Sequence, residues 1–108
     1  MSTNQLKEKT KSVERRLEYE KNKIKDYNAL QEEVDILRKR LKNCIELANE
    51  SYKSDGSKVI FDELLTESEK EYFNVRNGID DKLSKKRRKI GKLTNELDKL
   101  KRKKDTKE

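Results

Sequence analysis

The chain has 108 residues and a formal net charge of +7; 47% of the residues are charged, 30% are hydrophobic, and Trp, Pro and His are absent. This composition excludes a compact globule, and because Gly appears only three times it favours long amphipathic helices over disorder. The missing His and the single Cys44 exclude His-based catalytic triads, internal disulfides, and metal sites built on His or on several Cys.

The first predicted helix covers residues 6–53, after a disordered N-terminus at residues 1–5. Its apolar residues recur at steps of three and four, which is typical of a single buried seam on a helix. The seam thins between Leu17 and Ile24, where Glu20 and two lysines intervene, and Cys44 is expected to be a small core residue beside it. The predicted seam residues of this helix are Val13, Leu17, Ile24, Leu30, Val34, Leu37 and Leu41.

A bend with a short apolar segment is predicted at residues 54–65. Asp55 and Gly56 form the strongest local stop signal, because glycine accepts the positive φ that ends a helix. The apolar stretch that follows, residues 59–65, is either a short helix or a short strand. Thr66 and Glu69 match a capping box, which places the start of the second helix at Thr66.

The second predicted helix covers residues 66–104, before a disordered tail at residues 105–108. A seven-residue interval runs along it, interrupted only by Lys86, and a second apolar position accompanies it. Asn77 and Gly78 both tolerate helix ends and could split this helix. The predicted seam residues are Leu65, Tyr72, Ile79, Leu83, Ile90, Leu93, Leu97 and Leu100.

These elements predict an all-α fold, an antiparallel helical hairpin or coiled coil of two long helices joined by a short Gly-containing loop. With the bend near Gly56, residues 38–42 face residues 67–71 with opposite charge. Closer to the chain ends, Glu14, Glu18 and Glu20 lie level with Lys92 and Lys99. Opposite charges across a seam select register and orientation. Two helices alone bury little, so we expect oligomerisation or partner helices to complete the fold.

Basic residues form the other notable feature, since the whole net charge comes from residues 79–108. In the predicted alignment the lysines at 21–25 face residues 85–89, and this repulsion predicts an external acidic partner. The run 85–89 resembles a nuclear import signal or a phosphate-contacting patch, and it could equally be a solvated helix face. The predicted basic patch consists of Lys21, Lys23, Lys25, Lys85, Lys86, Arg87, Arg88, Lys89, Lys101, Arg102, Lys103 and Lys104.

We therefore expect a non-enzymatic coiled-coil structural or adaptor subunit that mediates protein–protein interactions in a larger intracellular complex. Its expected partners are other coiled-coil proteins or further copies of itself, with an acidic protein or nucleic acid at the basic patch. The alternative is an accessory nucleic-acid-binding protein that uses the basic C-terminal helix on phosphates without sequence specificity. No apolar run approaches the ~18 residues of a membrane span. No cofactor or small-molecule substrate is expected, and the expected location is the cytoplasm or the nucleus.

Overall fold

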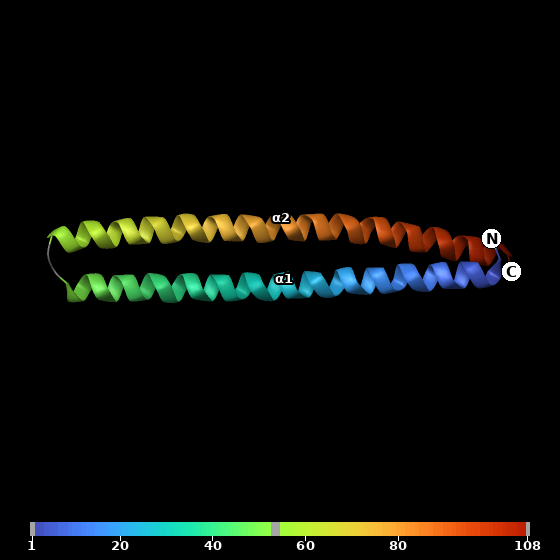
Figure 1. Ribbon diagram of the computed structural model, residues 1–108, viewed down its shortest axis with the longest axis horizontal. Helices are drawn as coiled ribbons and strands as arrows, with labels where there is room; N and C mark the ends of the chain where they lie inside the picture. The colour runs from blue at the N-terminus through green and yellow to red at the C-terminus, as the bar shows by residue number, and fades with distance from the viewer. Residues whose placement is uncertain (1, 53–54, 108) are drawn as a thin grey trace. The chain divides into compact units, whose positions relative to one another are not determined.

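A computed structural model describes residues 2–52 and 55–107 of the chain. It contains two long helices, α1 (Thr3–Ser51) and α2 (Asp55–Lys107), and the described residues include no strand (Figure 1). The predicted all-α helical hairpin is therefore confirmed. The parts of the predicted termini and bend that fall on residues 1, 53–54 and 108 lie outside the described residues.

The predicted disordered N-terminus is wrong for residues 3–5, because a capping box at Ser2 and Gln5 fixes the start of α1. The Ser2 hydroxyl accepts a hydrogen bond from the Gln5 amide at 3.2 Å, and the Gln5 side-chain oxygen accepts one from the Ser2 amide at 3.1 Å. This reciprocal pairing satisfies backbone donors that the first helical turn leaves without intrahelical acceptors. Leu6, fully buried one residue later, anchors the same turn. Residues 3–5 are therefore helical.

The predicted bend at 54–65 is wrong for residues 55–65, because α2 already begins at Asp55. The Thr66 hydroxyl donates to the carbonyl oxygen of Asp62 at 2.9 Å, a bond typical of a residue inside a helix rather than of an N-cap. No described residue, including Gly56, has a positive φ. Phe61 and Leu65 extend the helical spacing of Tyr72 toward the N-terminus, and this continuity outweighs the capping signal.

The predicted second helix is unbroken, since α2 continues through Asn77 and Gly78 without splitting, and buried Ile79 follows directly. The predicted disordered tail is wrong for residues 105–107. α2 continues through Asp105 to Lys107, since the basic residues before them are good helix formers and no Gly or Pro intervenes.

The hairpin divides into two units, each containing a segment of both helices. Unit 1 consists of residues 1–27 and 82–108, and unit 2 consists of residues 28–81. Unit 1 carries 21 Lys and Arg against 9 Asp and Glu, whereas unit 2 carries 8 against 13. The net charges are therefore +12 and −5, a segregation that the linear sequence conceals because unit 1 combines its two ends.

The main hydrophobic core lies in unit 1, where apolar side chains of the two helix segments pack together. Ile90 packs against this core from its edge, and Leu83 is also buried. Apart from Tyr19, no large hydrophobic side chain in the described part of unit 1 is exposed. The core consists of Leu6, Val13, Leu17, Leu93, Leu97 and Leu100.

Unit 2 is packed differently, since Ile45 and Ile79 are its only buried hydrophobic side chains among the described residues. Many of its other large hydrophobic side chains remain in contact with water. The exposed residues are Leu30, Ile36, Leu37, Leu41, Leu47, Tyr52, Val59, Ile60, Leu64, Phe73 and Val75.

Candidate interaction surfaces

The predicted seam residues fall into three groups by burial. Val13, Leu17, Ile79, Leu83, Leu93, Leu97 and Leu100 are buried, and Ile24, Val34, Leu65, Tyr72 and Ile90 are half-buried. The remaining three, Leu30, Leu37 and Leu41, are exposed. These three side chains are not buried within the chain itself, and their predicted role in contacts with partner helices stays a prediction.

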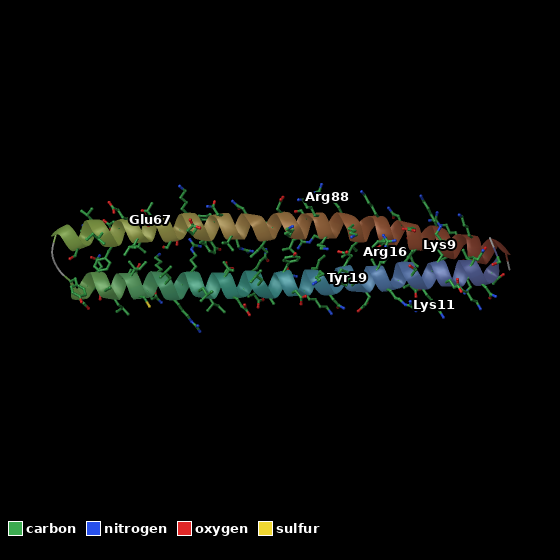
Figure 2. All side chains as sticks on the ribbon, in the orientation of Figure 1. Lys9, Lys11, Arg16, Tyr19, Glu67 and Arg88 are labelled. Carbon is green, nitrogen blue, oxygen red and sulfur yellow. The ribbon has the colours of Figure 1, made fainter. Side chains whose placement is uncertain are left out.

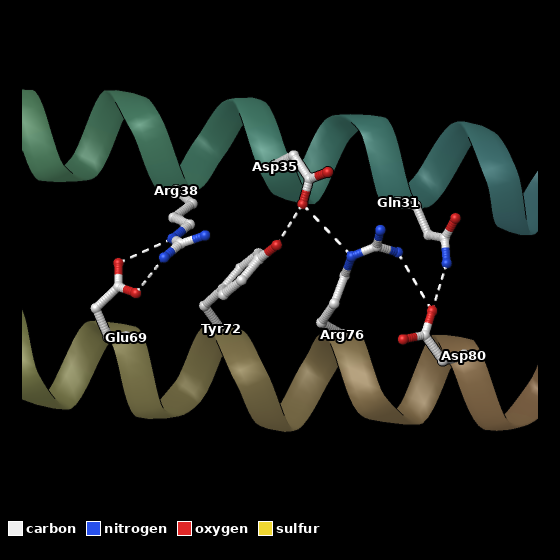
Figure 3. A network of polar contacts seen from close by, with 7 residues as sticks. All are labelled: Gln31, Asp35, Arg38, Glu69, Tyr72, Arg76 and Asp80. Atoms are coloured by element: carbon white, nitrogen blue, oxygen red, sulfur yellow. Dashed lines mark hydrogen bonds and ion pairs between the residues drawn. The ribbon is translucent and has the colours of Figure 1, made fainter.

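An ion pair between Arg38 and Glu69 joins the helices of unit 2 (Figure 3). The Arg38 Nε and Nη2 groups donate to the two Glu69 carboxylate oxygens at 2.9 and 2.6 Å. This bidentate pair confirms the predicted facing of residues 38–42 and 67–71. Its hydrogen bonds lower the pKa of Glu69 and raise that of Arg38, while desolvation opposes both shifts. The Arg38 guanidinium also lies 4.3 Å from the centroid of the Tyr72 ring.

A chain of polar contacts continues along the same helices (Figure 3). The Tyr72 hydroxyl donates to Asp35 Oδ1 at 2.6 Å, and Arg76 Nε lies 3.6 Å from the same oxygen. Arg76 also pairs with Asp80, whose carboxylate accepts a 2.6 Å hydrogen bond from Gln31. Polar side chains thus occupy much of the contact between the helices of unit 2, which explains why its leucines are left outside.

Leu37 and Leu41 line a hollow of about 400 Å³, which we call the apolar groove. Leu37 is 61% exposed and Leu41 47% exposed. Arg38 and Glu71 are the only charged residues that line the groove among the described residues, and the Arg38 guanidinium is held by Glu69. The other lining residues are Val34, Leu37, Leu41, Ser68, Tyr72 and Val75.

A buried carboxylate is the main polar feature of unit 1. Only 3% of the Glu20 side chain is exposed, with Oε2 at 2.9 Å from Lys86 Nζ and Oε1 at 3.1 Å from Lys89 Nζ. The hydrogen bond from Lys86 is the largest cause of a lowered pKa at Glu20; burial raises this pKa, and the hydrogen bond from Lys89 lowers it further. The same contact with Glu20 raises the pKa of Lys86. Glu20 was predicted to lie level with Lys92 and Lys99, but it pairs with Lys86 and Lys89, and its burial was not expected.

This arrangement corrects the predicted repulsion between the lysines at 21–25 and residues 85–89. Lys86 and Lys89 share the Glu20 carboxylate, and the ammonium groups of Lys23 and Lys86 lie 5.4 and 5.9 Å from the Tyr19 ring centroid. An internal acid and an aromatic ring therefore offset the like charges. All residues of the predicted basic patch belong to unit 1, and all except Lys23 and Lys86 are exposed.

Cys44 is exposed, so its predicted core role is wrong; Ile45 beside it is the buried residue. In residues 2–52 and 55–107, neither helix has a stretch apolar enough to cross a bilayer. The same residues include no group of three or more His, Cys, Asp or Glu side chains able to hold a metal ion.

No protein-family model, curated protein or solved structure matches this chain.

Proposed function

We propose that this chain is a non-enzymatic coiled-coil adaptor of a larger intracellular complex, and that unit 2 binds an amphipathic helix of another protein in the apolar groove. The observation that supports this proposal is the apolar groove, in which Leu37 and Leu41 are exposed to water. Removing apolar surface from water is worth roughly 25 cal/mol per Å², so a helix covering these side chains would be stabilised. Exposed apolar patches of this kind mark interaction sites on proteins.

The spacing of the lining residues supports a helical ligand. Val34, Leu37 and Leu41 lie at steps of three and four along α1, which places them on one face. Tyr72 and Val75 line the groove from α2. Grooves between two helices accept a third helix through its own i, i+3, i+4 and i+7 side chains.

The charges around the groove indicate the chemistry of the ligand's flanks. Within residues 2–52 and 55–107, Glu71 has no ion-pair partner, and unit 2 as a whole carries a net charge of −5. Lys or Arg beside the apolar face of the bound helix would offset this charge. A helix with Leu-type residues on one face and basic flanks fits the groove best.

A second copy of this chain satisfies these requirements less well. Its unit 2 has exposed apolar residues but carries the same negative charge, while its unit 1 has the opposite charge but keeps its leucines buried. We therefore commit to a different protein as the partner. We also propose that the complex containing this chain lies in the cytoplasm or the nucleus.

Affinity purification of the tagged full-length protein from its native cells, followed by mass spectrometry, tests the proposal with two paired variants. Leu37→Asp with Leu41→Asp puts charge into the groove, and Ile36→Asp with Leu47→Asp makes the matched change on exposed positions of α1 outside it. Since all four side chains are exposed, circular dichroism should show equal helicity. We expect the groove variant to lose helical partner proteins that the wild type and the control retain. Retention of the same partners by the groove variant would refute the proposal.

A further inference from the structure

A second hollow, of about 570 Å³, lies in unit 1 and is surrounded by cations from both helices. Arg16 contributes from α1 and Arg88 from α2; both are labelled in Figure 2. Five basic residues line the hollow against one acidic residue, Glu96. We call this the cationic groove, and its basic residues are Arg16, Lys85, Arg88, Lys89 and Lys92.

Two of these cations lack an acidic partner among the residues that the structure describes. In the described part of the chain, Arg16 and Lys92 form no ion pair. Arg88 makes a single long hydrogen bond, from Nε to the Ser84 carbonyl oxygen at 3.4 Å. Glu20, which would repel a bound anion, is turned inward and held by Lys86 and Lys89. The net charge of +12 on unit 1 adds a favourable long-range field.

The shortage of exposed apolar surface distinguishes between classes of anionic ligand. Leu93, the one apolar residue that lines the cationic groove, is 3% exposed, and Tyr19 is the only exposed large hydrophobic residue in the described part of unit 1. A protein interface normally buries a substantial apolar area at its centre. Binding to phosphates needs only cations, which gain affinity by releasing condensed counterions. Unit 1 therefore suits a polyphosphate backbone better than an acidic protein.

The same surface favours a duplex over a single strand. Single-stranded nucleic acids bind largely by stacking their bases on aromatic side chains, and Tyr19 is already flanked by Lys23 and Lys86. Along α2 the cations at 85, 88 and 92 follow at steps of three and four, or roughly 4.5 and 6 Å of helix rise. These steps place the three cations on one face of α2, where they can contact phosphates together.

We propose that the cationic groove binds the phosphate backbone of duplex nucleic acid without reading its bases. Binding there is independent of the apolar groove, since the two surfaces share no residue. A chain with both sites would link a protein partner to nucleic acid.

Fluorescence anisotropy with a labelled 20-base-pair duplex and the full-length protein tests this proposal, using DNA and RNA duplexes in separate arms. For three or four phosphate contacts, the logarithm of the association constant should fall against the logarithm of salt concentration with a slope of about −3 to −4. The triple variant Arg16→Gln, Arg88→Gln, Lys92→Gln should bind at least tenfold more weakly at 0.1 M salt. Its slope should be shallower by roughly 2 to 3.

The matched control is Lys39→Gln, Arg40→Gln, Lys70→Gln, which removes the same charge from exposed positions of unit 2. It should bind within about twofold of the wild type, and both variants should keep the wild-type circular dichroism spectrum. An equal loss in the control would show that net charge, rather than the groove, drives binding. No binding by the wild type, tighter binding of a single strand, or equal competition by polyglutamate would each overturn the proposal.

Discussion

The Glu20 carboxylate of α1 lies 2.9 Å from the Lys86 ammonium of α2. Each is the one charged residue in a series of otherwise apolar residues that follow one another at intervals of seven. A slip of one heptad would set Glu20 against an apolar residue and leave its carboxylate buried without a cation. Single buried polar contacts fix register in coiled coils for this reason. The two series are Leu6, Val13, Glu20, Tyr27 and Val34 on α1, and Leu65, Tyr72, Ile79, Lys86, Leu93 and Leu100 on α2.

Glu20→Gln should destabilise the hairpin, because it leaves a buried amide where a carboxylate met two ammonium groups. Lys86 and Lys89 remain partly exposed and can turn to water, so we expect a loss of about 1 kcal/mol, or roughly 4–8 °C in Tm. The double variant Glu20→Leu with Lys86→Leu should be at least as stable as wild type, since replacing both partners of a buried ion pair by an apolar contact is often neutral or favourable. Thermal melts of the three proteins check the order, and a leucine variant less stable than the glutamine variant would contradict it.

The ion pair at Glu20 should also make stability depend on pH. The folded pKa of Glu20 lies below its ordinary value of 4.5 because Lys86 and Lys89 favour the charged form. Its stabilising contribution is therefore fully present above the unfolded pKa and is lost as the pH falls through the lower folded pKa. The pKa of Lys86 is raised above 10.5, so the same contribution is lost at the alkaline end as the pH rises through the higher folded value.

The difference in Tm between wild type and Glu20→Gln should consequently be greatest between about pH 5 and 10 and should narrow toward pH 2. A difference that stays constant down to pH 2 would show that the carboxylate charge contributes nothing to stability.

Truncation of Leu97 should destabilise the isolated chain far more than truncation of Leu37, although both residues were predicted in the seam. Leu97 belongs to the unit 1 core, so Leu97→Ala should cost about 2–3 kcal/mol of unfolding free energy. Leu37 is 61% exposed, so Leu37→Ala should change the stability of the isolated chain by less than about 0.5 kcal/mol. Urea unfolding measures both values, and equal losses would place Leu37 inside a core.

Hydrogen exchange should separate the two units. Unit 1 has a six-residue core, whereas Ile45 and Ile79 are the only buried hydrophobic residues in the described part of unit 2. Local opening costs less where fewer apolar contacts must break. Backbone amides of residues 30–48 and 59–75 should therefore exchange faster than those of residues 6–20 and 88–100. Uniform protection in the isolated chain would contradict this difference.

Two long helices joined by a short Gly-containing loop were sufficient to predict the hairpin. Charge order predicted that residues 38–42 face residues 67–71, and the Arg38–Glu69 pair agrees with it. Apolar spacing was sufficient for the core of unit 1. Spacing alone could not show that Leu37 and Leu41 lie outside the helix contact, because a stripe at steps of three and four looks the same whether its own chain or a partner covers it. The contacts of Asp35 with Tyr72 and Arg76 occupy the space between the helices instead. Sequence spacing does not reveal such contacts, because they depend on which side chains meet across the hairpin.

The sequence does contain a signal that predicts the burial of Glu20. Leu17, Glu20 and Ile24 keep steps of three and four, and Glu20 falls seven residues after Val13. A charged residue at such a position, matched by Lys86 at the equivalent place on the other helix, indicates a buried pair rather than a gap in the seam. The division into a basic and an acidic unit was less accessible, since it requires the two ends of the chain to be counted together.

Site-specific photo-crosslinking in native cells tests most directly whether the apolar groove holds a helix of another protein. A photoreactive amino acid is placed at Leu41, which lines the groove, and in a control at Ile36, which is exposed on the same helix outside it. We expect position 41 to crosslink to the apolar face of a basic amphipathic helix in another protein, and we expect no such product from position 36. Crosslinks from position 41 only to further copies of this chain, or identical products from both positions, would contradict it.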